Sequence, residues 1–220
     1  MPKVKSIKSI FSRISLHIVV AASVLSSLTA CVPLILAGAV TGSMAALDRR
    51  STGIQVEDQQ IEFRAKNALA AAHKDENINI NSYNRIVLLT GEVSSANSGK
   101  LAAATVRKME NVADVVNELG VGANSSLSAR TSDATITTKV KTALIGDKLV
   151  NSQAHSVTTE RGVVYLQGRV TQSEGARVAE IAQGVSGVQK IVKVYEYISD
   201  AEYSRLQTQT APSQAASPAK

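Results

Sequence analysis

The most regular pattern along the chain is an apolar stripe with helical spacing, which occurs twice. Its members are Ile61, Ala65, Ala68, Leu69 and Ala72 in the first copy and Ile136, Val140, Ala143 and Leu144 in the second. Apolar side chains that recur every three or four residues share one face of an α-helix. Each stripe therefore predicts an amphipathic helix that packs on a core, with Asp58 and either Ser132 or Asp133 as the expected N-caps.

Strand patterns follow both stripes in the same order. A short alternating segment comes first, then a turn, then a run rich in β-branched residues. In the first copy these are 78–81, Asn84-Arg85 and 85–93, and in the second they are 156–159, Arg161-Gly162 and 162–170. The two β-branched runs align at an offset of 77 residues. An internal repeat of this kind indicates two copies of one small domain.

A second helical stripe and a last strand complete each copy. The stripes are Ala102, Thr105, Val106 and Met109 in the first copy and Val178, Ile181, Ala182 and Val185 in the second. The final strands are expected near 112–119 and 188–198. The predicted fold class is α+β, with two tandem αββαβ domains, each a small three-stranded sheet packed on two helices.

The first thirty residues have the pattern of a secretory signal peptide. A cationic stretch without acids is followed by the apolar run 14–28, as export signals require. The run ends in Leu28-Thr29-Ala30-Cys31, which is similar to a bacterial lipobox, where the cysteine thiol accepts diacylglycerol. The alternative is a buried thiol in an uncleaved membrane helix. Two or three acyl chains on Cys31 would hold the mature protein firmly on its membrane, and Val32, where inner-membrane lipoproteins usually carry Asp, indicates the outer membrane.

Charge and composition set the remaining limits. The net charge of +6 includes four bases of the signal peptide, so the mature chain, with 20 bases and 18 acids, carries only +2. The basic isoelectric point is therefore no evidence for nucleic acid, and we expect no nucleic-acid partner. The expected segments are a signal peptide at 1–30, a lipidated tether at 31–53, a first domain at 54–121, a linker at 122–130, a second domain at 131–198 and a disordered tail at 199–220.

The chain shows no catalytic or metal-binding motif. His73 and His155 have no Cys, Asp or Glu at ligand spacing, so we expect both on the surface. The acidic pair Asp75-Glu76 is interpreted as solvated charge. No P-loop, GxGxxG or Gly-x-Ser-x-Gly motif occurs. We therefore expect a protein that is not an enzyme and that uses no metal and no cofactor.

The order of elements resembles a known family. Together with the Val163–Val170 run and Gly184-Val185-Ser186-Gly187-Val188, it looks like the BON domain. Two such domains behind a lipobox are similar to the dual-BON-domain outer-membrane lipoproteins of Gram-negative bacteria, over 54–198. The first copy departs from the pattern at Arg85 and at Asn111, where the second has glycine. Asparagine tolerates positive φ, so Asn84 and Asn111 can absorb these turns.

The resemblance implies a periplasmic module that binds anionic phospholipids, such as phosphatidylglycerol and cardiolipin, and supports outer-membrane integrity, also at division sites. Charge counts favour the second domain for this contact, because the first carries a net −2 and the second +2. The predicted lipid-binding residues lie on the first helix of that domain, on its outward side or, for Lys139, on its flank, or follow this helix. They are Thr135, Thr138, Lys139, Lys141, Thr142, Ile145 and Lys148.

Two alternatives remain open. The lysines of this helix can simply solvate a surface, and interfacial helices favour Trp or Tyr where Thr135 stands, which predicts a weaker affinity. A chaperone-like or interaction role is the second alternative, in which a sheet edge or helix face binds the outer-membrane protein assembly machinery. The dependence of binding on ionic strength distinguishes the two roles, since lipid binding weakens as ionic strength rises and binding through an apolar patch does not.

Overall fold

The computed structural model describes residues 48–210, with side chains as far as Leu206. The signal peptide, Cys31, most of the tether and the end of the tail therefore lie outside the described residues. Both repeats belong to one compact unit. None of the helices within residues 48–210 is long and apolar enough to cross a bilayer.

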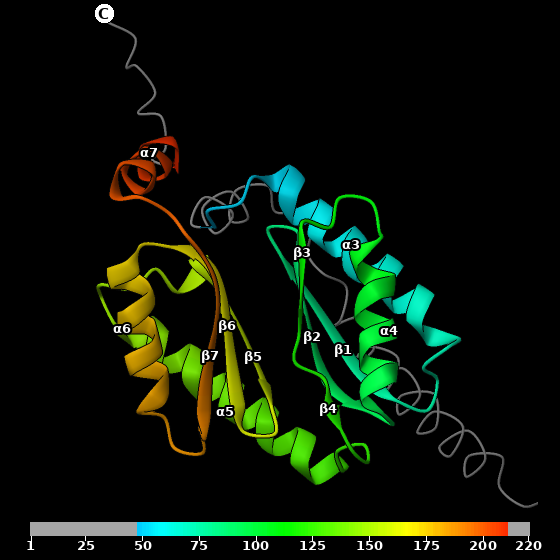
Figure 1. Ribbon diagram of the computed structural model, residues 1–220. Coiled ribbons are helices and arrows are strands. Elements are labelled where there is room, and N and C mark those ends of the chain that lie inside the picture. Colours follow the sequence, from blue (N-terminus) through cyan, green and yellow to red (C-terminus); the bar gives the residue numbers. More distant parts are fainter. Residues whose placement is uncertain (1–47, 211–220) are drawn as a thin grey trace, which may run out of the picture. The chain divides into compact units, whose positions relative to one another are not determined.

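Each repeat forms a small sheet with helices on one face (Figure 1). The first repeat consists of α3 (Thr52–Ala70), β1 (Asn77–Tyr83), β2 (Ile86–Val93), α4 (Ala96–Arg107), β3 (Asp114–Asn117) and β4 (Gly120–Val121). The second repeat consists of α5 (Leu127–Gly146), the short η2 (Ser152–Ala154), β5 (His155–Glu160), β6 (Val163–Val170), α6 (Gln172–Gln183) and β7 (Lys190–Tyr197). This confirms the predicted α+β class with two αββαβ units.

The central strand of each sheet has one antiparallel and one parallel neighbour. β2 pairs with β1 in antiparallel register and with β3 and the short β4 in parallel register. β6 pairs in the same way with β5 and β7. The parallel neighbour is possible because a helix crosses over between β2 and β3 and between β6 and β7.

The predicted stripes form the two cores. Ile61, Ala65 and Leu69 of α3 are buried against β2 and α4, and Ile136, Val140 and Leu144 of α5 against β6 and α6. Ala68 and Ala72 are exposed instead. The cores are almost wholly aliphatic, and burying each large side chain contributes about 1.5–3 kcal/mol.

The expected N-caps of the first helices are wrong. Both helices begin earlier, at caps provided by Ser51 and Ser126, whose side chains accept from Ile54 N and Ala129 N. α5 therefore begins inside the segment 122–130 that was expected to be a linker. Serine is a favoured N-cap because its oxygen satisfies one of the free N–H groups of the first turn.

The two aspartates instead hold the hairpin turns. Asp58 accepts from the backbone N–H groups of Asn84 (2.9 Å) and Arg85 (2.7 Å). Both turn residues have positive φ, 51° and 67°, as a type I′ turn requires. The turn in the second repeat is built in the same way around Asp133, which accepts from the two backbone N–H groups of its turn at 2.8 and 2.9 Å. A buried carboxylate thus pairs donors that would otherwise be unsatisfied.

A further helix follows the second repeat. α7 (Asp200–Thr210) lies within the expected disordered tail, so that expectation is wrong for this part of the tail. Its first turn carries Asp200 and Glu202, which favour a helix N-terminus, and Glu202 accepts from Arg169 at 2.7 Å. Tyr203 lies under the guanidinium of Arg49, 4.6 Å from its ring centroid.

Two consecutive arginines fix the start of the described chain to both repeats. Arg49 donates twice to Glu174, at 2.6 and 2.8 Å. Arg50 donates to Asp58 at 2.8 Å and lies 4.1 Å from the ring centroid of Tyr83. The last residues of the expected tether are therefore bound to the folded unit. Removing one partner of a buried ion pair strongly destabilises a protein. The ion pairs of Arg49 and Arg50 therefore hold this segment against both repeats.

The sheet faces away from the helices carry the contacts between the repeats, which we call the interdomain seam. Leu88, Thr90 and Glu92 on this face of β2 are at most 1% exposed. Tyr83 Oη donates to the carbonyl oxygen of Ala154 at 3.1 Å, and Gln167 Nε2 donates to that of Ile86 at 3.3 Å. Strands buried on both faces read as continuous apolar runs, which is the pattern of residues 86–89 in β2.

Candidate lipid-contacting face

The structure places all seven predicted lipid-binding residues on the surface. Six lie on α5 and one follows it, and each is exposed: Thr135, Thr138, Lys139, Lys141, Thr142, Ile145 and Lys148. Ile145 is 68% exposed. A large aliphatic side chain of this exposure makes no contribution to the core and is available to an apolar surface.

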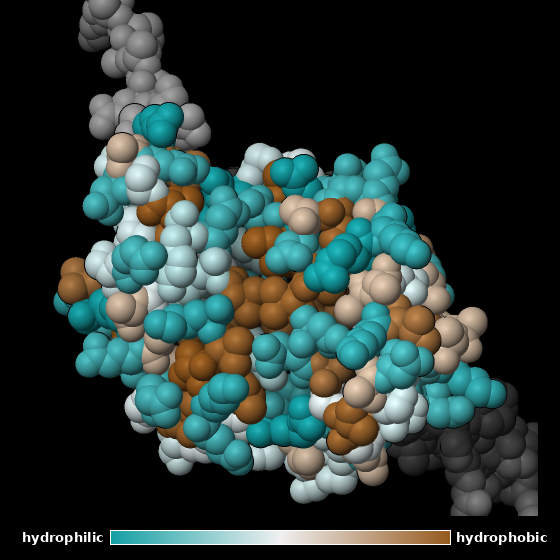
Figure 2. Space-filling model, viewed as in Figure 1, coloured by the Kyte–Doolittle hydropathy of each residue, from teal (hydrophilic) through white to brown (hydrophobic). Residues whose placement is uncertain are grey.

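Two more apolar side chains lie at the ends of α5. Leu127 and Leu149 are 78% and 74% exposed. Sequence reasoning missed Leu127 because the helix begins earlier than expected, and it missed Leu149 because that residue follows the last turn. The one sequence signal that could have found these two exposed side chains is that each is a leucine outside the apolar stripe. Figure 2 shows apolar surface in the second repeat around β7.

The threonines of α5 present methyl groups rather than hydroxyl donors. The Oγ1 hydroxyls of Thr135, Thr138 and Thr142 each donate to the carbonyl oxygen four residues earlier, at 2.9 Å. This back-bonding uses the hydroxyl hydrogen inside the helix. The outward face is therefore less polar than its composition suggests.

The acids near this face are already engaged. Asp133, the only acid within α5, is buried and bound to the hairpin turn. Asp147, just after the helix, accepts from Arg177 at 2.6 and 3.1 Å. These hydrogen bonds lower the pKa of Asp147. The outward face consequently presents lysines and no acid, which favours an anionic partner.

The histidines are not on the surface, contrary to expectation. The side chain of His73 is 8% exposed and that of His155 is 0% exposed. His73 Nδ1 lies 2.6 Å from Glu76 Oε2, so Glu76 is not solvated charge either. Burial raises the pKa of Glu76, but hydrogen bonds from Ser94, His73 and Ser98 lower it to about 2. The cluster supports the start of α4. Glu76 stands three residues after His73, a spacing that sequence reasoning missed, whereas Ser98 lies 25 residues away and gave no signal.

The same cluster lacks the geometry of a catalytic relay. Ser98 Oγ lies 3.2 Å from His73 Nδ1, the same ring nitrogen that faces Glu76. A relay needs the acid and the nucleophile on opposite nitrogens of the imidazole. Within the part of the chain that the structure describes, no group of three His, Cys, Asp or Glu residues could hold a metal ion.

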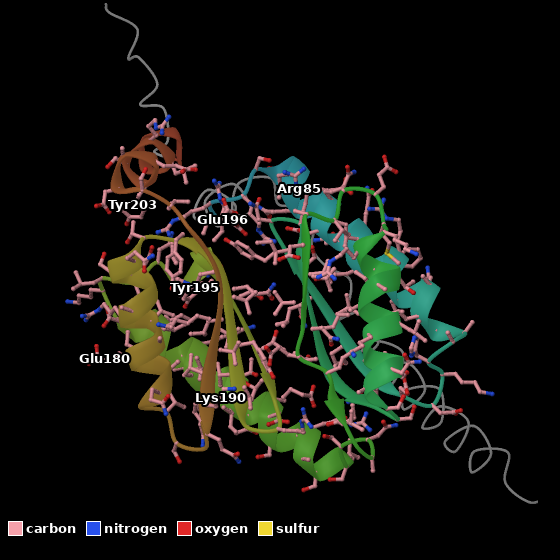
Figure 3. The ribbon with its side chains drawn as sticks, in the orientation of Figure 1. Arg85, Glu180, Lys190, Tyr195, Glu196 and Tyr203 are labelled. Carbon is pink, nitrogen blue, oxygen red and sulfur yellow. The ribbon has the colours of Figure 1, made fainter. Side chains whose placement is uncertain are left out.

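Charged side chains also cross the interdomain seam. Glu196 of β7, labelled in Figure 3, accepts from Arg169 Nε at 3.0 Å and from the side-chain amide of Asn84 in the first repeat. Asn79 donates to Glu160 at 2.8 Å. Burial raises the pKa of Glu160. The seam therefore uses the polar side chains of the sheet faces, which leaves the outward face of α5 free.

Residues 57–123 and 132–198 each match the BON domain family. The chain therefore belongs to this family, with two copies of the domain in tandem. It is similar to the outer membrane lipoprotein DolP of Haemophilus influenzae, with 36% identity over 174 residues, 78% of this chain and 90% of that protein.

Two further relatives match over shorter stretches. The 21 kDa hemolysin of Actinobacillus pleuropneumoniae is 32% identical over 155 residues, 69% of this chain and 80% of that protein. The osmotically-inducible protein Y of Escherichia coli is 29% identical over 141 residues, 62% of this chain and 70% of that protein.

These matches confirm the resemblance to dual-BON lipoproteins and the expected location, a lipid anchor at the outer membrane. The predicted anchoring residue, Cys31, lies outside the described residues. The family and the relatives point to a non-catalytic protein.

Proposed function

We propose that this outer-membrane lipoprotein binds anionic phospholipid, such as phosphatidylglycerol or cardiolipin, through the outward face of α5 and so supports outer-membrane integrity, including at division sites. One observation carries the proposal: the face combines exposed lysines with an exposed Ile145 and has no free acid.

The expected free energies of membrane binding suit a protein that a lipid anchor already holds at the membrane. Each lysine near an anionic surface contributes about 1 kcal/mol, and burying Ile145 adds roughly 1.5–3 kcal/mol. The sum of these contributions would give only weak membrane binding to a protein without an anchor. A lipid anchor raises the effective concentration of the membrane, however, so a weak face is enough to orient the second domain on it.

A second candidate function has its own observation. Phe63 of α3 and Leu101 of α4 are 68% and 57% exposed, and both lie in the first domain, which carries a net −2. An apolar side chain on an acidic domain suits a protein partner better than an anionic surface. The partner would belong to the machinery that assembles outer-membrane proteins.

Vesicle sedimentation of the mature chain made without lipid (Cys31→Ala) tests the first function. We expect binding to vesicles that contain phosphatidylglycerol or cardiolipin, little binding to neutral vesicles, and weakening with salt. Changing Lys139, Lys141 and Lys148 to Glu should abolish this binding without affecting folding, because all three are exposed.

Matched changes in the first domain provide the control. Arg64→Glu and Lys66→Glu should leave vesicle binding nearly unchanged. Equal contributions from both domains, or a triple variant that binds as before, would contradict lipid binding through α5. Binding to purified assembly proteins that persists at high salt and is lost in Phe63→Ser would support the second function instead.

A further inference from the structure

Each of the two sheets has a free edge at the first strand of its hairpin. In the described part of the chain, β1 pairs only with β2, and β5 pairs only with β6. A strand directs its backbone N–H and C=O groups alternately to its two sides. Every second residue of β1 and of β5 therefore offers these groups to the free edge. A row of such groups is a template for a further strand.

The outward positions of β5 follow from its turn. Glu160 is the last residue before the two-residue turn and pairs with Val163, and residues that flank such a turn are hydrogen-bonded to each other. The backbone groups of Glu160 thus point toward β6, so those of Thr159 and Val157 point away from it. Both residues are at most 9% exposed, and within residues 48–210 their outward backbone groups have no hydrogen-bond partner. Unpaired backbone groups inside a protein are uncommon, and here they lie in one row.

The edge of β1 offers fewer such groups. The same alternation places Ser82 and Ile80 outward, and Ser82 confirms it, since its N–H donates to the side chain of Glu62 at 2.7 Å. Of these two outward residues, Ile80 lines the space between the strands and Ser82 does not, whereas both outward residues of β5 line it. A new strand therefore finds more free backbone groups on β5 than on β1.

A hollow of about 460 Å³ gives access to these groups. β1 contributes residues 79–81 to its wall, β5 contributes residues 157–160, and one face of α5 completes it between Arg130 and Thr137. Four strand residues span about 13 Å at ~3.3 Å each. The hollow is therefore long enough for a short extended segment that lies along β5.

The seam side of the hollow carries a carboxylate with an unused acceptor. Glu160 is 5% exposed and accepts from Asn79 through Oε2 at 2.8 Å, and within residues 48–210 its Oε1 has no hydrogen-bond partner. Burial raises the pKa of Glu160, and the charges of Glu92 and Asp133 add to this effect. A buried charge that is incompletely paired is unfavourable, so a cation that enters the hollow would be stabilised at Glu160.

The α5 side of the hollow is small and weakly polar. Thr137 donates its hydroxyl hydrogen to β5 at 2.7 Å, and Ala134 is exposed. Among the described residues, Arg130 is the one base of the wall, and its Nε donates to the carbonyl oxygen of Ser125 at 3.0 Å. A wall with Arg130 on one side and Glu160 on the other does not suit an anionic lipid. Its free backbone donors and acceptors suit the main chain of a peptide.

We propose that this hollow is a docking site for an extended segment of another polypeptide, which adds to β5 as a fourth strand of the second sheet and places a basic side chain at Glu160. Its main chain bonds to Val157 and Thr159, and its side chains alternate between α5 and the seam. In strand addition of this kind the main chain provides affinity and the side chains provide specificity. The site goes beyond the proposed lipid binding, because it does not use the outward face of α5.

A short peptide probe tests where the strand adds. The probe is a capped pentapeptide with the order threonine, valine, lysine, valine, threonine, in which the lysine faces the seam and the valines face α5. When it is added to the mature chain with Cys31→Ala, hydrogen exchange should slow at the amides of Val157 and Thr159. The amides of Thr158 and Glu160, which face β6, should be protected with and without the probe. Protection that appears at Ile80 instead would overturn the assignment to β5.

Methylated probes test the main-chain bonds without changing the protein. The valine N–H groups of the bound probe face β5, whereas the lysine N–H faces away. Methylation of both valine nitrogens should therefore lower the affinity by more than about tenfold, and methylation of the lysine nitrogen should have a much smaller effect. Equal losses for the two methylated probes would overturn strand addition.

A charge change tests the specificity at Glu160. The probe with lysine should bind more tightly than the same peptide with glutamate at its centre. Glu160→Gln keeps an acceptor for Asn79 and should lower the affinity for the lysine probe by about fivefold, which brings the two peptides close to equal affinity. Glu180→Gln, an exposed change on α6 outside the hollow, is the matched control and should keep the preference.

The remaining outcomes separate this site from the lipid-contacting face. The variant with Lys139, Lys141 and Lys148 changed to Glu should bind the lysine probe at least as well as the unchanged protein. Loss of probe binding in that variant would place the peptide on the outward face of α5 and overturn the proposal. An unchanged preference in Glu160→Gln, or no binding of the lysine probe to the unchanged protein, would also overturn it, and both results would leave lipid binding through α5 intact.

Discussion

Replacing Asp133 tests the structural role of the two buried aspartates most directly. Asp133 is 7% exposed, and its carboxylate accepts from the backbone N–H groups of Arg161 and Gly162. Hydrogen bonds to a charged group contribute about 1.5–3 kcal/mol each. Asp133→Ala removes both and leaves two donors of a tight turn unpaired, but water can reach the turn once the carboxylate is gone. We expect a loss of about 2–4 kcal/mol in the free energy of unfolding.

The comparison variants make the assay specific. Ser126→Ala removes the true N-cap of α5 and should cost about 1 kcal/mol. Asp133→Asn keeps one acceptor oxygen, so its loss in the free energy of unfolding should lie between those of Asp133→Ala and Ser126→Ala. Hydrogen exchange provides the local readout, because the amides of Arg161 and Gly162 should lose protection in Asp133→Ala and keep it in Ser126→Ala. Equal destabilisation by the two alanine variants, with the turn amides still protected, would refute the turn-binding role and restore Asp133 as an ordinary residue of the helix start.

Three further predictions concern the anchor, the sheet and acid stability. Cys31→Ala should abolish lipid attachment, and metabolic labelling that still finds an acylated protein in the outer membrane would contradict this. Gly168→Val should destabilise the second domain by about 1–3 kcal/mol, because a Cβ there would lie 2.8 Å from the carbonyl oxygen of Ala154; an unchanged melting temperature would count against it. Burial raises the pKa of Glu174, but His155 and the Arg49 guanidinium lower it to about 2, below its ordinary 4.5. The resulting stabilisation is complete above about pH 4.5 and is lost as the pH falls toward 2, so melting temperatures should drop over that interval and drop less in Glu174→Gln.

The helices and sheets could be predicted because their signal is local. The stripes around Ile61 and Ile136 and the runs at β2 and β6 are repeated patterns, and periodicity reports directly on which side chains face a core. The positive φ values of Asn84 and Asn111 also followed from residue type, since asparagine tolerates this conformation.

The buried polar residues could not be predicted because their partners are distant in sequence. Asp58 looks like an N-cap by its position before an apolar stripe, yet its partners lie 26 and 27 residues later in the turn. His155 looks like a surface residue until β6, α6 and β7 surround it. Position alone cannot distinguish a capping aspartate from one that binds a distant turn, because both precede a helix stripe.

The interdomain seam covers much of the open face of both sheets. A two-layer domain with helices on one side of its sheet leaves the other side of the sheet uncovered. Here the uncovered sides meet each other through Tyr83, Gln167 and the buried Glu92, and a hollow of about 460 Å³ remains between β1, β5 and α5. The outward surface of the helices also stays accessible, and there the two copies have diverged. α3 displays Phe63, whereas α5 displays Lys139, Lys141 and Ile145. Duplication of one fold has thus left the protein with two chemically different helix faces, and the cationic one suits the membrane that its own anchor enters.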